Sequence, residues 1–160
     1  MNRLRTAVVG VGYLGHFHAQ KYKALSTQAE LSMELVAVCD QHEPQAKKIG
    51  EALGVLVVTS PKELIGKVDA VTIATVTPAH YEVAKLFLQN GIHVNVEKPI
   101  AMTSAQAREL VELADKNKLA LAVGHSERFG TIFQKLTNEL KGTSLRWVEL
   151  SRYAPFNKRG

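Results

Sequence analysis

Short apolar runs rich in β-branched residues alternate along this 160-residue chain with longer segments of helical periodicity. Most of the runs lack a strict alternation of apolar and polar residues, which is typical of strands covered on both faces of a sheet. We therefore expect six strands, at residues 4–9, 35–39, 55–58, 70–74, 92–96 and 119–123.

Helical segments separate these strands, and the first three have clear boundaries. Residues 13–25 form the first helical segment, and Pro44 and Gly54 bracket the second. A capping box at residues 60–63, with the sequence Ser-Pro-Lys-Glu, predicts a short third helix.

The later helices are predicted from their caps and apolar faces. Thr77 should cap a helix that Pro78 opens and Gly91 closes. Residues 104–117 and a last helix before Gly142 have the apolar spacing of a core-facing helix. Their expected inner faces are Ala107, Leu110, Val111 and Ala114 in the first, and Phe129, Ile132, Phe133, Leu136 and Leu140 in the second.

Six strands separated by helices predict an α/β fold. The expected architecture is a doubly wound parallel sheet of the Rossmann type, with strand order 3-2-1-4-5-6, formed by residues 1–142. Residues 144–153 resemble one extra strand with apolar side chains on both faces. This sheet offers the extra strand no position, so residues 143–160 should be a separate C-terminal strand and tail.

Composition excludes several classes of protein. Apolar residues make up 46% of the chain and charged residues 22%, which excludes disorder. The single cysteine, Cys39, excludes a disulfide framework and a cysteine-rich zinc module. The net charge of +5 is scattered along the chain, which suits a small anionic ligand and not a nucleic acid. No apolar run approaches the ~20 residues of a membrane helix. We expect a cytoplasmic protein without a membrane partner.

A glycine-rich motif, Gly10-Val11-Gly12-Tyr13-Leu14-Gly15, follows the first strand and opens the first helix. In this context Gly10 permits a tight turn, Gly12 lets the backbone approach a pyrophosphate, and Gly15 lets the helix lie close to the strand. The free N–H groups of the helix N-terminus favour phosphate. The motif therefore predicts dinucleotide binding.

Asp40 ends the second strand, where folds of this kind place the acid that reads the ribose. Its carboxylate can accept hydrogen bonds from both hydroxyls of the adenosine ribose and repels a 2′-phosphate. Gln41 and His42 follow it, and no Arg, so the sequence favours NAD over NADP. The alternative is a bare tight turn followed by a surface Asp.

The tripeptide Glu97-Lys98-Pro99 follows the fifth strand, at the carboxyl edge where open α/β sheets bind ligands. A Lys beside a nicotinamide can exchange a proton with a carbinol. Taken alone, the tripeptide is equally consistent with a solvated turn.

Four motifs occur in order: Gly10-x-Gly12-Tyr13-x-Gly15-x-x-His18, Ala74-Thr75 with Pro78 and His80, Gly91-Ile92-His93-Val94-x-x-Glu97-Lys98-Pro99, and Gly124-His125 with Arg128-Phe129. Together they resemble the glucose–fructose oxidoreductase, inositol dehydrogenase and rhizopine-catabolism (Gfo/Idh/MocA) family. The resemblance covers essentially the whole chain, and Glu-Lys-Pro is its most specific element.

This resemblance implies a nicotinamide-dependent oxidoreductase that acts on a hydroxyl of a sugar, cyclitol or nucleotide sugar. The adenosine half of the cofactor would be held by Gly10, Gly12, Tyr13, Leu14, Gly15 and Asp40. The path to the nicotinamide would be lined by Thr75, Pro78, His80, Glu97 and Lys98, with Lys98 as the catalytic candidate.

One departure from the family bears on function. Family enzymes continue into a mostly antiparallel sheet domain that completes the catalytic site, whereas this sequence stops after the first strand of that domain. Three hypotheses stay open: an NAD-dependent dehydrogenase, a non-catalytic dinucleotide-binding module or scaffold, and a fragment of a longer enzyme. We expect weak or absent turnover from these 160 residues alone.

Four further residues carry candidate chemistry. His16 and His18 lie two apart on one helix and do not share a face, so we expect no metal site. His18 is interpreted as a helix-packing or cofactor-edge residue. Cys39 is interpreted as a small buried hydrophobe and not as a nucleophile. His125, after the sixth strand, could face the nicotinamide pocket.

The tail carries aromatic and aliphatic mass around Trp147. A strand with two apolar faces invites association when it is exposed. The sequence therefore predicts a homodimer formed through residues 143–160.

Overall fold

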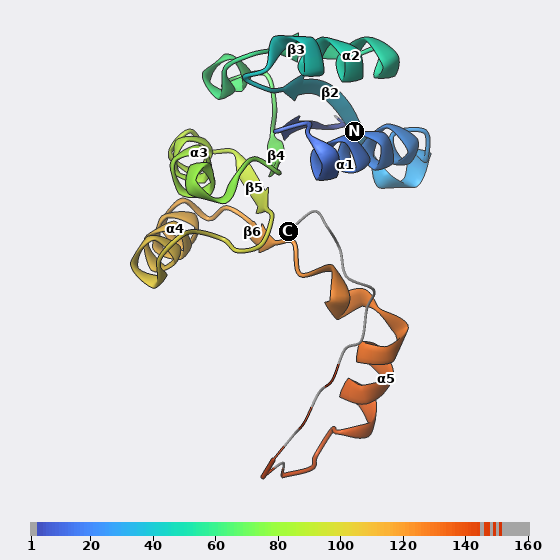
Figure 1. Ribbon diagram of the computed structural model, residues 1–160, viewed down its shortest axis with the longest axis vertical. Helices are drawn as coiled ribbons and strands as arrows, with labels where there is room; N and C mark the ends of the chain where they lie inside the picture. Colours follow the sequence, from blue (N-terminus) through green and yellow to red (C-terminus); the bar gives the residue numbers. More distant parts are fainter. Residues whose placement is uncertain (1–2, 145, 148, 150, 152–160) are drawn as a thin grey trace. The chain divides into compact units, whose positions relative to one another are not determined.

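The computed structural model describes residues 3–144, 146, 147, 149 and 151 (Figure 1). The chain divides into two compact units, Met1–His125 and Ser126–Gly160. The boundary expected from the sequence, between residues 142 and 143, stays a prediction. No helix in the described part of the chain is long and apolar enough to cross a membrane.

The first unit contains a six-stranded sheet in which every neighbouring pair is parallel. The strands are β1 (Leu4–Val9), β2 (Met33–Cys39), β3 (Leu56–Val58), β4 (Ala70–Ile73), β5 (His93–Val96) and β6 (Leu121–Val123). Their order is β3-β2-β1-β4-β5-β6, which confirms the predicted doubly wound α/β fold.

Four α-helices and two 3₁₀ helices connect these strands. They are α1 (Tyr13–Leu25), η1 (Ala29–Leu31), α2 (Glu43–Leu53), η2 (Pro61–Leu64), α3 (Thr77–Gln89) and α4 (Ser104–Asn117). Gly54 ends α2 with φ 63°, and the capping box at Ser60 is present, as the sequence predicts. The prediction that Thr77 caps α3 is wrong, since Val76 takes the N-cap position. Pro78 fits either of the first two positions of a helix, so it does not fix the first helical residue to within one position.

Alternate residues of the strands face two separate layers of helices. Val8 of β1 packs with residues of α1 and α2 on one face, while Ala7 and Val9 pack toward α3 and α4 on the other. The larger core cluster is the second one, which contains Phe87, Leu88 and Leu110; α3 and α4 lie side by side there (Figure 1). Val111 was expected in this core but is 47% exposed, since it lies at the edge of the apolar face of α4.

The second unit contains η3 (Ser126–Phe129) and α5 (Thr131–Glu139). The predicted inner face of this last helix is not buried: Phe129 and Ile132 are 79% and 84% exposed. The predicted strand at 144–153 falls partly outside the described residues, which leave out residues 145, 148, 150, 152 and 153. It stays a prediction.

Candidate functional site

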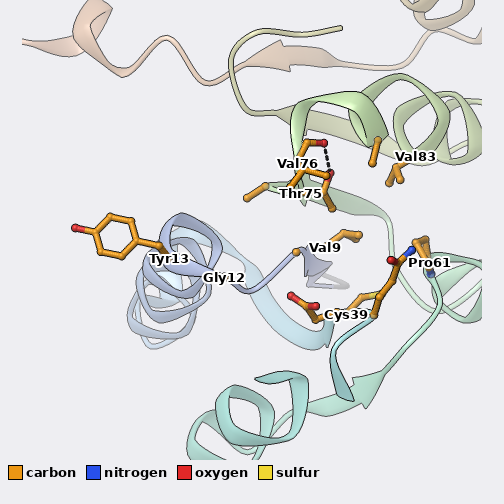
Figure 2. Close-up of a pocket in the computed structure, with 13 residues that line it drawn as sticks. Val9, Gly12, Tyr13, Cys39, Pro61, Thr75, Val76 and Val83 are labelled. Atoms are coloured by element: carbon orange, nitrogen blue, oxygen red, sulfur yellow. Dashed lines mark hydrogen bonds between the residues drawn. The ribbon is translucent and has the colours of Figure 1, made fainter. Parts of the chain in front are cut away.

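A pocket of about 380 Å³ opens at the carboxyl edge of the sheet, where β1 and β4 are neighbours and the chain direction of the crossovers reverses (Figure 2). The loop after β1 supplies Gly10 and Gly12, and β2 supplies Cys39 with the following Asp40. Thr75 and Val76 line the opposite wall (Figure 2). This edge is where open α/β sheets bind ligands.

The glycines of the motif after β1 are explained by different structural constraints. Gly10 has φ +83°, and a Cβ there would lie 2.7 Å from the backbone nitrogen of Thr75. A Cβ on Gly15 would lie 1.7 Å from the carbonyl oxygen of Gly10. Both glycines are therefore required by the fold itself.

Gly12 is different, because a Cβ at this position would have no atom within 4 Å. Gly12 is the N-cap of α1 and lines the pocket, and it has an ordinary φ of −65°. The fold has room for a larger residue here, and a glycine leaves the backbone open to the approach of a ligand. The structure thus fits a pyrophosphate against this turn.

The N-terminus of α1 can receive a negative charge. No side chain caps the helix, and its first turn contains no acidic residue. The dipole of the helix therefore directs a partial positive charge toward the pocket edge.

Asp40 is fixed on the pocket wall by two backbone amides. The amide of Val11 donates to Oδ2 at 2.9 Å, and the amide of His42 donates to Oδ1 at 2.9 Å. Each oxygen keeps a lone pair, so the carboxylate can still accept two ribose hydroxyls. The side chain of Gln45 donates to the carbonyl of Val11 at 2.8 Å. No sequence motif identifies Gln45 or the Val11 amide as parts of this site.

The remaining residues predicted to hold the adenosine half lie at the start of α1. Tyr13 lines the pocket and is 69% exposed; its ring points outward, away from Val9 and Cys39 (Figure 2). Leu14 is also exposed.

Cys39 is buried, and burial raises the pKa of its thiol to about 12, with smaller contributions from Asp40 and Glu63. The thiol is therefore neutral and acts as a small hydrophobe, as expected.

His80 connects two loops and does not line the pocket. Its ring is 1% exposed, with Nε2 3.0 Å from the carbonyl oxygen of Thr75 and Nδ1 2.8 Å from that of Pro99. Pro78 lies in the first turn of α3, and Thr75 is on the pocket wall. The loops that follow β4 and β5 are thus held together by one buried imidazole.

Glu97 and Lys98 follow β5, at the same edge of the sheet. Glu97 is 9% exposed, and its Oε1 lies 2.9 Å from Nε2 of His18 on α1. Lys98 is exposed, and its ammonium forms no ion pair with any described residue. His18 thus packs against a definite partner, Glu97, which the sequence motif did not identify.

Comparison with known proteins points to one family. Residues 4–125 match the sequence profile of GFO_IDH_MocA, described as an oxidoreductase family with an NAD-binding Rossmann fold. UDP-N-acetylglucosamine 3-dehydrogenase from Acidithiobacillus ferrooxidans is 37% identical over 159 residues, which are 99% of this chain and 48% of that protein. D-glucoside 3-dehydrogenase from Escherichia coli is 35% identical over 86% of this chain and 39% of its own length.

Solved structures agree with this similarity. The A. ferrooxidans enzyme superposes with a TM-score of 0.78, over 87% of this chain and 44% of that chain, at 36% identity. The WlbA dehydrogenase from Chromobacterium violaceum, solved with NADH and UDP-GlcNAcA, has a TM-score of 0.79 at 28% identity, over 88% of this chain and 40% of its own. The chain spans less than half the length of each of these relatives.

Proposed function

This chain belongs to the Gfo/Idh/MocA oxidoreductase family, and on that premise we propose that its first unit binds NAD and serves hydride transfer at a carbinol of a sugar or nucleotide sugar. The observation that carries the proposal is the pair formed by Asp40 and Gly12. An oriented carboxylate and an open backbone turn line the same pocket, as the binding of an adenosine ribose and a pyrophosphate requires.

The dinucleotide would extend across the carboxyl edge in both directions from β1. Its adenosine half lies toward Asp40 and β2, with the pyrophosphate at the N-terminus of α1. Its nicotinamide half then lies beyond Thr75, toward the loop after β5 that carries Lys98. NAD is favoured over NADP because the carboxylate of Asp40 would repel a 2′-phosphate. No Arg follows Asp40 to pair with that phosphate.

Lys98 is the catalytic candidate for proton transfer. Bound NAD would supply the acceptor for a hydride from the carbinol carbon. The uncharged amine of Lys98 would take the hydroxyl proton of the same carbinol and return it in the reverse direction. Its exposed position and its lack of an ion pair among the described residues leave the side chain available to a substrate.

The substrate class is supported by the relatives. Two of the relatives are named as dehydrogenases of UDP-N-acetylglucosamine and of a D-glucoside, and both compounds carry sugar hydroxyls that can be oxidised. The chain spans less than half of these relatives, so the substrate side of the site depends on protein beyond these residues. The second candidate function, a dinucleotide-binding module or scaffold without turnover, is supported by the same observation.

Calorimetric titration of the chain with NAD, NADP and ADP-ribose tests the binding proposal. We expect NAD and ADP-ribose to bind and NADP to bind more weakly. A turnover assay with UDP-sugars and simple sugars then separates the dehydrogenase from the module. Binding of none of the three nucleotides would overturn the proposed function.

Residues 143–160 are proposed to form a homodimer interface. The support is the apolar content of residues 144–153, half of which lie outside the described part of the chain. Light scattering on the full chain and on a chain ending at Gly142 tests it. A monomeric full chain, or a dimer that survives the truncation, would contradict the interface.

A further inference from the structure

We propose that His18 and His80 are positioning residues, which fix the backbone on the two sides of Lys98 and so place its amine at the nicotinamide end of the site. This inference rests on the proposed function, since it concerns the same nicotinamide half. It adds two residues that act through Lys98 without touching substrate.

The first anchor is on the N-terminal side of Lys98. The Glu97 carboxylate has one oxygen 2.9 Å from Nε2 of His18, and the other accepts the Lys98 amide at 3.3 Å. His18 lies one helical turn after Gly15, on the face of α1 that packs toward the glycine turn. The contact therefore joins α1 to the end of a strand that is two places from β1 in the sheet.

The Glu97 carboxylate is enclosed from a third direction by β6. Gly124 follows β6, and a Cβ at this position would lie 2.7 Å from Oε1 and 2.9 Å from Oε2 of Glu97. A glutamate is seldom buried unless it is paired, because removing a carboxylate from water is costly. The position of this carboxylate is thus defined by α1, by its own backbone and by the end of β6 together.

The second anchor is on the C-terminal side of Lys98. Nδ1 of His80 lies 2.8 Å from the carbonyl oxygen of Pro99, and Nε2 lies 3.0 Å from that of Thr75. A neutral imidazole donates to one of these carbonyls, and a protonated imidazole donates to both. Because the ring is 1% exposed, its position is fixed by the packing of α3.

Lys98 itself has no comparable restraint. Its ammonium makes no ion pair within the described part of the chain, so its location depends on the backbone that carries it. That backbone is held at Glu97 from α1 and at Pro99 from α3. A catalytic group must be held within a fraction of an ångström of its working position, and such anchors provide this.

The test uses two nucleotide probes that differ in the nicotinamide end. ADP-ribose lacks the nicotinamide and reports the adenosine half alone, whereas NADH fluorescence reports the surroundings of the nicotinamide. We would measure the binding of both probes to three variants: His18→Ala, Gly124→Ala and, as the matched control, His16→Ala. Gly124→Ala displaces the Glu97 carboxylate without removing a polar group. His16 lies on the same helix and stacks on Phe17, whereas the hydrogen bond to Glu97 comes from His18.

We expect His18→Ala and Gly124→Ala to leave ADP-ribose affinity unchanged within about twofold, and to weaken NADH about tenfold, the size expected for a lost hydrogen bond to a charged group. The emission of bound NADH should shift in both variants. His18→Gln, whose amide can donate to Glu97, should recover part of the loss. His16→Ala should change neither probe.

A double-mutant cycle with Lys98→Ala decides whether the effect passes through Lys98. In the Lys98→Ala background, His18→Ala should cause no further change in NADH affinity or emission. An undiminished effect there, or unchanged NADH binding by His18→Ala and Gly124→Ala, would overturn the positioning role while the proposed function stands. A third result would also overturn it: both variants lose ADP-ribose binding and also lose their cooperative thermal unfolding transition. The contact between His18 and Glu97 would then be needed for folding and not for the position of Lys98. If the unaltered chain binds neither probe, the proposed function itself fails.

Discussion

The backbone amide of Val11 donates a hydrogen bond of 2.9 Å to the carboxylate of Asp40, 29 residues later in the chain. The bond joins the glycine turn after β1 to the end of β2, so the parts of the pocket that we propose bind the pyrophosphate and the ribose are fixed to each other. A second amide, from His42, holds the other carboxylate oxygen at 2.9 Å. The ribose acceptor is therefore oriented by the protein itself.

Asp40→Ala should lower the affinity for NAD and reduce the difference between the affinities for NAD and NADP. The change removes a charged acceptor, which should cost on the order of 1.5–3 kcal/mol of NAD binding free energy. It also removes the charge that repels a 2′-phosphate. Titration calorimetry with both cofactors measures the two effects. An unchanged preference for NAD in the variant would show that Asp40 does not discriminate between them.

Gly12→Ala and Gly15→Ala should separate binding from folding. A Cβ on residue 12 has open space, so the variant should keep its stability within about 1 kcal/mol, the size of a changed helix N-cap. It should nevertheless lose NAD, because the methyl group occupies the approach to the pyrophosphate. Gly15→Ala places a Cβ 1.7 Å from a carbonyl oxygen, and should cost about 3 kcal/mol or more.

Denaturant unfolding followed by circular dichroism, with NAD titration on the folded variants, measures the stability and the NAD affinity. The two glycines serve as controls for each other, since both belong to the glycine-rich motif after β1. A Gly12→Ala variant that binds NAD normally would contradict the role of this turn in pyrophosphate binding.

The thiol of Cys39 should be slow to react in the folded protein. Burial raises its pKa to about 12, so the fraction of thiolate stays negligible up to about pH 10. The rate of modification by a disulfide reagent should therefore stay far below that of an exposed cysteine of pKa about 8.5 throughout the range from pH 8 to pH 10. The denatured chain provides the control rate. A folded-state rate that equals the denatured-state rate and levels off above about pH 9 would place an accessible thiolate in the pocket.

The strand order and most element boundaries follow from the sequence, because buried parallel strands and helix caps are local signals. The glycine turn and Asp40 were predicted for the same reason: each lies directly after a strand. The contact between His18 and Glu97 was not predicted, since it spans 79 residues and depends on how α1 crosses the sheet edge. The burial of His80 between the carbonyl oxygens of Thr75 and Pro99 was not predicted either, because it depends on the loop after β5, which no local pattern describes.

The helix expected to bury Phe129 and Ile132 shows another limit of local patterns. Its apolar spacing predicts the helix α5 but not the surface that would cover it, and both residues are exposed. Periodicity identifies which face of a helix is apolar. The partner of that face is a property of the rest of the fold.

Asp69→Asn should lower the thermal stability of the protein near neutral pH. Asp69 accepts from the Arg5 amide at 2.8 Å and from the Arg5 guanidinium at 2.6 and 3.1 Å, which joins the start of β1 to the turn before β4. These bonds lower the pKa of the Asp69 carboxyl below its ordinary value of 3.8. Because the pair is partly exposed, solvent screens it, and the loss should be about 1 kcal/mol.

The pH dependence of this loss has a definite sign. A carboxyl whose pKa is lowered in the folded state contributes stability that is fully present above its unfolded pKa and is lost as pH falls through its folded pKa. The difference in free energy of unfolding between the unaltered chain and Asp69→Asn should therefore be largest above pH 4 and shrink progressively below that value, as Asp69 becomes protonated. Urea unfolding at a series of pH values measures it, with Asp115→Asn as a control, since Asp115 forms no ion pair among the described residues. A difference that stays constant down to pH 2 would show that Asp69 contributes through its shape and not through its charge.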